Sequence, residues 1–390
     1  MIEKVGIDCV GCGACVASCP QHCVRMKSNA EGFLYPEIDY YKCVDCNKCE
    51  MVCPVLYNGE LHDISNAQLY GVRSKSSYEN EIKKSASAGV FYFLAKYVID
   101  AYGYVFGAVF DSEDFHVKHI CGSTLEDIQR MQNSKYVQSD TGGVFEKVKE
   151  KLSNGKNVPV LFCGTPCQCL GLKAFLGKEY NNLYIVDIVC HGVPSPLAFK
   201  KYFNYLRECK GENPTDFQFR YKYKGWNYHG YMSSYVKYNN HYWPTVKDPY
   251  MSSFLKMNNY RECCYTCQYN TTKKVSDLTL ADFAKVKKHA PDFFTKSGCS
   301  EIYIHTQKGR MLFQNISPYV EFITLDISQM NGILTKKRIR PKVRDTIYEG
   351  INTLDDKSYV ETILQKSISK KSILRFYMPP IIRNLISGRR

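Results

Sequence analysis

The sequence predicts an α+β fold of several domains, and three features of its 390 residues indicate this. Nine cysteines crowd the first 53 residues. Apolar strands and amphipathic helices alternate over residues 158–209, and residues 217–243 then change to a period of two. We therefore expect a small cysteine-rich domain at 1–56, a linker at 57–68, an α/β domain at 69–320 that also holds an antiparallel meander, and a helical basic tail at 321–390.

The N-terminal cysteines repeat one pattern, C-x₂-C-x₂-C-x₃-C-P, twice. In this pattern the two-residue spacers let three thiolates surround one [4Fe–4S] cube, and the fourth cysteine reaches the neighbouring cluster. Paired four-thiolate zinc sites are the alternative, although zinc ligands are usually split into separated pairs. We predict two [4Fe–4S] clusters, one on Cys9, Cys12, Cys15 and Cys53 and the other on Cys43, Cys46, Cys49 and Cys19.

The next segment begins with short elements that a few local signals define. Residues 68–73 are expected to form a strand. Ser85 or Ser87 is expected to cap a helix over about 89–99, whose apolar residues keep helical spacing. A buried strand over 103–110 and a short helix over 125–131 follow.

Residues 158–209 read as strand, helix, strand, helix. Ser195 caps the second helix, and Pro196 occupies its first position. Such a repeat predicts two parallel strands joined by a right-handed crossover. The loops that follow the strands, which begin at Gly164 and Cys190, then share the carboxyl edge of one sheet, where open α/β sheets bind ligands. We therefore expect Cys167 and Cys190 to lie beside one crevice.

Residues 217–243 alternate aromatic and polar side chains and predict an antiparallel meander with one aromatic face. That face could stack a base or a flavin ring, or it could pack on a core. A CxxC pair, Cys264 and Cys267, follows the meander. Together with Cys167 and Cys190 it would complete a four-thiolate set, so we predict a third [4Fe–4S] cluster; the alternative is that Cys167 and Cys190 are buried apolar thiols.

Composition narrows the class of protein. No apolar signal segment precedes the first motif, and free thiols with clusters need a reducing compartment, so we expect a cytoplasmic location. No run of 18 apolar residues predicts a transmembrane helix. The net charge of +14 is densest in the tail, which predicts contact with an anionic membrane or an acidic partner, or else a solvated terminus packed loosely on the body. No recognised nucleic-acid module accompanies the charge.

Six motifs in order over residues 69–309 resemble the beta subunit of coenzyme F420-reducing hydrogenases and dehydrogenases. Two of these motifs depart from that family's usual residues: Ala88 stands where glycine is usual, and Ala281 and Ala284 flank Asp282-Phe283 where glycine and tryptophan are usual. The matching motifs are residues 85–90 (SASAGV), 135–139 (KYVQS), 164–168 (GTPCQ), 190–195 (CHGVPS), 264–267 (CYTC) and 277–283 (DLTLADF).

The resemblance implies FAD, a core cluster and electron flow from the ferredoxin clusters to the flavin. A flavin would convert single electrons into a hydride for a small-molecule substrate. His191 could donate the accompanying proton or simply hold its loop, and Lys135 could offset phosphate or flavin charge or be a surface lysine. The residues expected to contact the flavin are Ser87, Gly89, Lys135, Gly164, Thr165, Gln168, Asp277 and Asp282.

Three functions follow as hypotheses. The first is an iron–sulfur flavoprotein oxidoreductase that receives electrons from a low-potential donor such as ferredoxin. Cell-surface polysaccharide metabolism is one pathway in which it could act. The second is a non-catalytic electron-transfer subunit of a hydrogenase or formate dehydrogenase complex. The third is a redox-sensing interaction protein.

Overall fold

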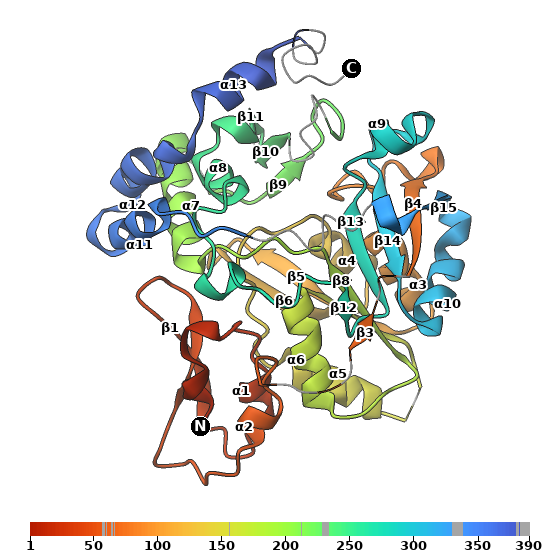
Figure 1. The fold of residues 1–390 in the computed structure, drawn as a ribbon, viewed down its shortest axis with the longest axis vertical. Coiled ribbons are helices and arrows are strands. Elements are labelled where there is room, and N and C mark those ends of the chain that lie inside the picture. The colour runs from red at the N-terminus through yellow and green to blue at the C-terminus, as the bar shows by residue number, and fades with distance from the viewer. Residues whose placement is uncertain are drawn as a thin grey trace.

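The computed structural model describes residues 1–56, 59, 61–63, 65, 67–155, 157–211, 213–227, 234–329, 338–379 and 382. Much of the expected linker at 57–68 therefore lies outside the described residues. Figure 1 shows a large central sheet with the N-terminal unit beside helix α6 (Pro166–Leu176) and the C-terminal helices next to the meander. The predicted class, a cysteine-rich unit followed by an α/β domain with a meander, is confirmed.

The two cysteine motifs of the N-terminal unit fold in the same way. In each, a left-handed residue, Gly13 with φ 77° or Asn47 with φ 57°, begins a short helix that carries the third cysteine of its run. An antiparallel hairpin pairs Val24 with Ile38 between the two motifs. The elements are η1 (Ile2–Asp8), α1 (Ala14–Ser18), β1 (Val24–Ser28), β2 (Leu34–Ile38) and α2 (Lys48–Met51).

An eight-stranded mixed sheet organises the second part of the chain, in the order β15-β4-β14-β13-β8-β7-β5-β6. Strands β5, β7, β8 and β13 run parallel, which confirms the predicted parallel pair within residues 158–209. The expected domain end at residue 320 lies at the start of the edge strand β15, which pairs with β4, so residues 321–325, expected in the tail, belong to this sheet. The strands are β4 (Gln68–Ser74), β5 (Tyr104–Asp111), β6 (His116–Gly122), β7 (Val160–Gly164), β8 (Leu183–Ile188), β13 (Leu278–Asp282), β14 (Ser300–Ile304) and β15 (Val320–Leu325).

Helices cover both faces of this sheet. Apolar residues of α3 and α10 pack on one face, and those of α5 and α6 pack on the other. Short 3₁₀ turns connect the elements, namely η2 (Ser76–Tyr78), η5 (Pro291–Phe293), η6 (Ser317–Tyr319) and η7 (Ile327–Gln329). The remaining helices around the sheet are α3 (Val90–Asp100), α4 (Leu125–Met131), α5 (Val144–Ser153), α9 (Val286–His289) and α10 (Gln307–Ile316).

The predicted cap of α3 is wrong. Neither Ser85 nor Ser87 accepts from the first turn of the helix; Gly89, with φ 76°, occupies the N-cap position without a side-chain bond. The Ser87 hydroxyl instead donates to the carbonyl of Cys299 at 2.7 Å. A Cβ on Gly89 would lie 2.2 Å from Ile82, so this left-handed glycine allows the loop to pack closely.

The meander packs on a second core. Phe217 and Phe219 are buried against α7 and α8, so packing on a core is confirmed for these two rings. The elements here are α7 (Pro196–Lys210), β9 (Phe217–Tyr221), β10 (Tyr235–Tyr238), β11 (His241–Pro244), η3 (Thr245–Lys247), α8 (Pro249–Leu255) and η4 (Glu262–Cys264), with a small separate pair of β3 (His62–Asp63) and β12 (Lys273–Lys274).

The C-terminal helices complete the same core, although the basic residues Lys366, Lys370, Lys371 and Arg375 remain exposed. Ile347, Tyr348, Tyr359 and Leu364 are all buried in it. Within the described residues, no helix has the length and apolar character to cross a bilayer. The elements are α11 (Val343–Thr353), α12 (Asp356–Ser358), the π-helical η9 (Tyr359–Ile363), η10 (Leu364–Ser367) and α13 (Lys370–Tyr377).

Candidate metal centres

The first predicted ligand set gathers at the contact between the N-terminal unit and α6. Cys12, Cys15 and Cys53 are buried. Burial, together with the charges of Cys9 and Cys53, raises the pKa of Cys15 to about 12. The amide of Gly11 donates to the Cys9 sulfur at 3.4 Å. A metal bound to these thiols would favour their deprotonation, because cysteine binds metals as the thiolate.

The second predicted set lines a cavity of its own. Cys19, Cys43, Cys46 and Cys49 all face this cavity, and Cys46 is exposed. Cys23 also faces it, with its sulfur 3.3 Å from that of Cys19, although the sequence pattern does not mark it as a ligand. The second set therefore lies nearer the protein surface than the first.

The third predicted set comes from three separate segments at the carboxyl edge of the sheet. Cys167 is the second residue of α6, Cys190 follows β8, and Cys264 ends η4. Burial, together with the charges of Cys264 and Cys267, raises the pKa of Cys190 to about 12. Burial and the charges of the other three thiols also raise the pKa of Cys167. The structure thus brings these four thiols together.

Two other cysteines near this loop, which do not belong to the predicted ligand set, lie elsewhere. Cys169 is fully buried, and its thiol donates to the carbonyl of Val186 at 3.7 Å. Burial raises the pKa of Cys163 to about 12, but the charged neighbours of this thiol are Asp187 and Lys135 rather than the other cysteines.

The first and third sets meet across α6. Gly171 lies one turn beyond Cys167, and a Cβ there would lie 2.9 Å from the Cys12 sulfur and 3.4 Å from Pro54. Burial raises the pKa of Cys12, and Cys167 is among the thiols whose charge raises it further. Burial, together with the charges of Cys12, Cys167 and Cys53, also raises the pKa of Tyr269 well above its usual value. The absence of a side chain at Gly171 thus lets Cys12 of the first set pack directly against the helix that carries Cys167 of the third set.

Side chains of the α/β domain hold the cysteine loop of residues 9–13. The Thr141 hydroxyl donates to the Cys12 carbonyl at 2.7 Å, and Arg261 donates to the Cys9 carbonyl at 2.7 Å. The Cys263 thiol donates to that same carbonyl at 3.3 Å. No signal in the sequence indicates these contacts beyond the position of Arg261, three residues before the CxxC pair.

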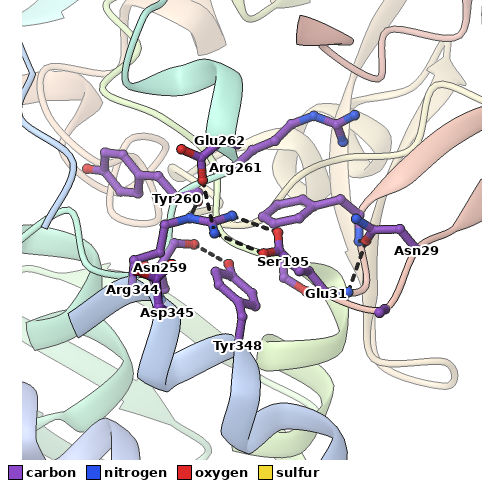
Figure 2. A network of polar contacts seen from close by, with 12 residues as sticks. Asn29, Glu31, Ser195, Asn259, Tyr260, Arg261, Glu262, Arg344, Asp345 and Tyr348 are labelled. Carbon is purple, nitrogen blue, oxygen red and sulfur yellow. Dashed lines mark hydrogen bonds and ion pairs between the residues drawn. The ribbon is translucent and has the colours of Figure 1, made fainter. Parts of the chain in front are cut away.

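The C-terminal segment holds the third set and the N-terminal hairpin. Arg338 donates to the carbonyls of Cys190 at 2.7 Å and Cys264 at 3.4 Å. Figure 2 shows Arg344 between Glu31 of the hairpin and Glu262 of η4. Composition alone predicts either an outside partner or a solvated terminus for the basic tail, and neither expectation indicates these internal contacts.

The side chains expected to contact a flavin have partners inside the protein. The Lys135 ammonium donates to three carbonyls at the end of α4, and burial lowers the pKa of Lys135 to about 7. Gln168 accepts from the backbone of Thr165 at 3.0 Å and donates to Ser139 at 2.9 Å. Asp282 forms a two-pronged pair with the buried Arg220.

The remaining candidates are not brought to one place. Ser87, Gly89, Gly164 and Asp282 lie toward the carboxyl ends of β7 and β13, whereas Asp277 precedes β13 at the opposite edge of the sheet. There Asp277 accepts from the amide of Ile185 and the hydroxyl of Thr306. His191 is exposed in the loop after Cys190. In this conformation the residues named for FAD do not fit an open flavin site, and we derive no step through it.

Beside Asp282, Glu301 gives the fold a pH dependence. This glutamate is fully buried on β14, where it accepts from the Tyr303 hydroxyl at 2.9 Å. Burial raises the pKa of Glu301 from 4.5 to about 7. Because the unfolded chain releases this proton near pH 4.5, the free energy of unfolding should fall between about pH 4.5 and pH 7, by about 3 kcal/mol at most.

Glu301→Gln should remove that part of the pH dependence. Its apparent melting temperature, measured anaerobically at several pH values, should vary less between about pH 5 and pH 8 than that of the unmodified protein. Glu349→Gln, at an exposed position of α11, is the matched control and should leave the pH profile unchanged. An unchanged profile in Glu301→Gln would contradict the assignment.

Two family models match the chain, one in its N-terminal part and one in the part that follows. Residues 8–56 match the family model of the 4Fe-4S dicluster domain, and residues 159–328 match the model of the C terminus of the coenzyme F420 hydrogenase/dehydrogenase beta subunit. These matches confirm the predicted resemblance: the N-terminal part is similar to 4Fe-4S dicluster domains, and the part that follows is similar to the C terminus of coenzyme F420 hydrogenase/dehydrogenase beta subunits.

Two curated relatives are similar to separate parts of the chain. One subunit of the F(420)H(2) dehydrogenase of Methanosarcina mazei is 25% identical over 190 residues, which are 46% of this chain and 51% of that protein. A ferredoxin of Pyrobaculum islandicum is 43% identical over 56 residues, which are 14% of this chain and 49% of that protein. The chain thus spans about half the length of the curated relatives it matches.

Among solved structures, a chain of the F420-reducing [NiFe] hydrogenase complex from Methanosarcina barkeri is similar, with a TM-score of 0.47 and 13% identity over 74% of this chain and 92% of that chain. The dicluster match and the ferredoxin relative support two [4Fe–4S] clusters in the N-terminal domain, as the cysteine pattern predicts. The chain is therefore similar in separate parts to a ferredoxin and to an oxidoreductase subunit.

Proposed function

We propose that this protein carries electrons from an external low-potential donor, through its two ferredoxin-type ligand sets, to a third [4Fe–4S] cluster on Cys167, Cys190, Cys264 and Cys267. The observation that carries the proposal is the contact across Gly171, where Cys12 of the first set meets the helix that presents Cys167. When bound, each such cluster accepts and donates a single electron.

The chain's own residues give this route a fixed geometry. The exposed Cys46 marks the second set as the end nearest an external donor. Thr141 and Arg261 hold the first set against the α/β domain. Arg338 fixes the backbone of two ligands of the third set through their carbonyl oxygens. Electrons therefore enter at the surface and reach the sheet edge without movement of a domain.

The final acceptor separates two versions of the function. In the first, which the resemblance implies, FAD bound at the sheet edge would supply two-electron chemistry for a small-molecule substrate, and the protein would be an oxidoreductase in its own right. In the second, the protein is a non-catalytic subunit that passes single electrons to a partner. The internal bonding of Lys135, Gln168 and Asp282 favours the second version. A flavin assay on anaerobically purified protein decides between them.

The third cluster has a direct test in iron content. Purified anaerobically, the protein should contain about twelve irons, at four for each cube. Cys167→Ala should lose about four of them and keep the spectroscopic signals of the N-terminal clusters. Cys163→Ala is the matched control, because this thiol lies nearby but faces Asp187 and Lys135, and it should keep all of the iron. About eight irons in the unmodified protein would refute the third cluster.

A further inference from the structure

One buried cation lies between the first and third ligand sets. Arg261 is 0% exposed and ranks among the largest fully buried side chains of the protein. Its Nε donates to the Cys9 carbonyl at 2.7 Å, and its charge acts on the thiols of both Cys9 and Cys264. It therefore lies within electrostatic reach of two sets that bind anionic clusters.

Arg261 is held there by groups that carry no charge. One terminal nitrogen donates to the Gln138 side-chain oxygen at 3.1 Å, and the guanidinium lies 4.0 Å from the centre of the Tyr35 ring. The other terminal nitrogen has no hydrogen-bond partner among the described residues. No carboxylate in the described part of the chain forms an ion pair with this guanidinium.

An arginine cannot escape burial by losing its proton, so its charge needs compensation. Burying an unpaired charge costs several kcal/mol unless an opposite charge is close. A cube held by four thiolates is anionic overall. The clusters on either side are therefore the counter-charges that the protein itself does not provide.

The backbone of Arg261 ties it to the third set as well. Its amide donates to the Val193 carbonyl at 2.9 Å, in the loop that follows Cys190, and its own carbonyl accepts from the amide of Cys264 at 3.0 Å. One residue thus contacts the first cysteine loop through its side chain and two loops of the third set through its main chain.

We propose that Arg261 is a positioning residue that fixes the spacing of the first and third clusters and, through its buried charge, makes their reduction more favourable. A nearby positive charge stabilises the reduced cluster, which carries one more electron, over the oxidised one. The role of Arg261 at the third cluster rests on the proposed function, whereas its role at the first cluster rests only on the ferredoxin-type domain.

The test is an anaerobic redox titration of the full-length holoprotein with dithionite, followed by electron paramagnetic resonance. In Arg261→Gln the ratio of reduced to oxidised first cluster at a fixed potential should fall about tenfold, equivalent to a midpoint about 59 mV lower for one electron. Arg261→Lys keeps the charge and should stay closer to the unmodified protein. Arg25 is a surface arginine of the N-terminal domain, so Arg25→Gln should not shift the midpoint potential of the first cluster.

Iron content separates the outcomes. Arg261→Gln is not informative if it loses iron, and in that case Arg261→Lys tests the role of the charge. A lysine variant that keeps its iron and a nearly unchanged midpoint potential supports that role. The proposed role of Arg261 is overturned if Arg261→Gln has an unchanged midpoint potential, or if both variants lose iron. Failure of the third cluster would instead appear in the unmodified protein, as about eight irons rather than twelve.

Discussion

Arg344→Ala is expected to destabilise the protein by about 3 kcal/mol and to loosen the N-terminal domain from the rest of the chain. Arg344 is 3% exposed and donates to both carboxylate oxygens of Glu31, at 2.8 and 2.6 Å. It also donates to the Tyr260 carbonyl and pairs with Glu262. Its removal leaves Glu31, itself 28% exposed, without a cation.

The position of Arg344 explains why its removal should weaken the attachment of the N-terminal domain. The hairpin turn at residues 29–32 rests on the α/β domain through three links shown in part in Figure 2: Arg344 with Glu31, the Ser195 hydroxyl with the Glu31 carbonyl, and Asn352 with the Ala30 carbonyl. Arg344 supplies the only charged link of the three. Without it we expect faster cleavage in limited proteolysis near the domain junction.

A surface pair on the same hairpin provides the control. Arg25 also forms a forked contact with a glutamate, Glu37, but the arginine is 77% exposed. Arg25→Ala should therefore leave the apparent melting temperature unchanged within error. Both variants are compared anaerobically at one scan rate, because cluster loss makes unfolding irreversible. Equal melting temperatures for Arg344→Ala and Arg25→Ala would contradict a stabilising role for the clamp.

The sequence predicted the local elements well because their signals are local. The doubled cysteine pattern predicted the N-terminal ligands, and Ser195 followed by Pro196 marked the start of α7 correctly. The antiparallel half of the sheet was not predicted. Its strand β4 pairs with β14 and β15, which lie more than 200 residues further along the chain. No periodicity in a single sequence indicates which distant strands will meet.

The candidate site shows the same limit. The spacing of the third cysteine set was readable, since two parallel strands deliver Cys167 and Cys190 to one edge. The arginines around these sets were not, because Arg344 and its partner Glu31 are 313 residues apart. The basic residues between 366 and 375 are exposed, as a solvated tail requires, whereas Arg338 and Arg344, earlier in the same segment, bond to loops of the protein. Composition reports how much charge is present but not whether it is buried.

Lys274→Met is expected to have the largest effect on stability of any variant considered, about 3–5 kcal/mol. Lys274 and Asp187 form an ion pair at 3.0 Å in which both side chains are 1% exposed. Asp187 also accepts from the Thr279 hydroxyl. Without the ammonium, a carboxylate is left buried with only a hydroxyl partner, and that is far more costly than the loss of an exposed pair.

The pair also supports the third ligand set. Asp187 lies on β8, three residues before Cys190, and Lys274 lies on β12, seven residues after Cys267. Lys274→Met should therefore lower the apparent melting temperature and also reduce the iron content toward that of Cys167→Ala. Lys273→Met, at the exposed neighbouring position, should do neither.

A double variant tests whether the cost comes from the unpaired charge. In Lys274→Met with Asp187→Asn, both charges are gone, while the asparagine oxygen still accepts from Thr279. Replacing both members of a buried pair is often nearly neutral, so most of the lost stability should return. If the double variant is as unstable as Lys274→Met alone, the lysine acts through packing of its chain rather than through its charge.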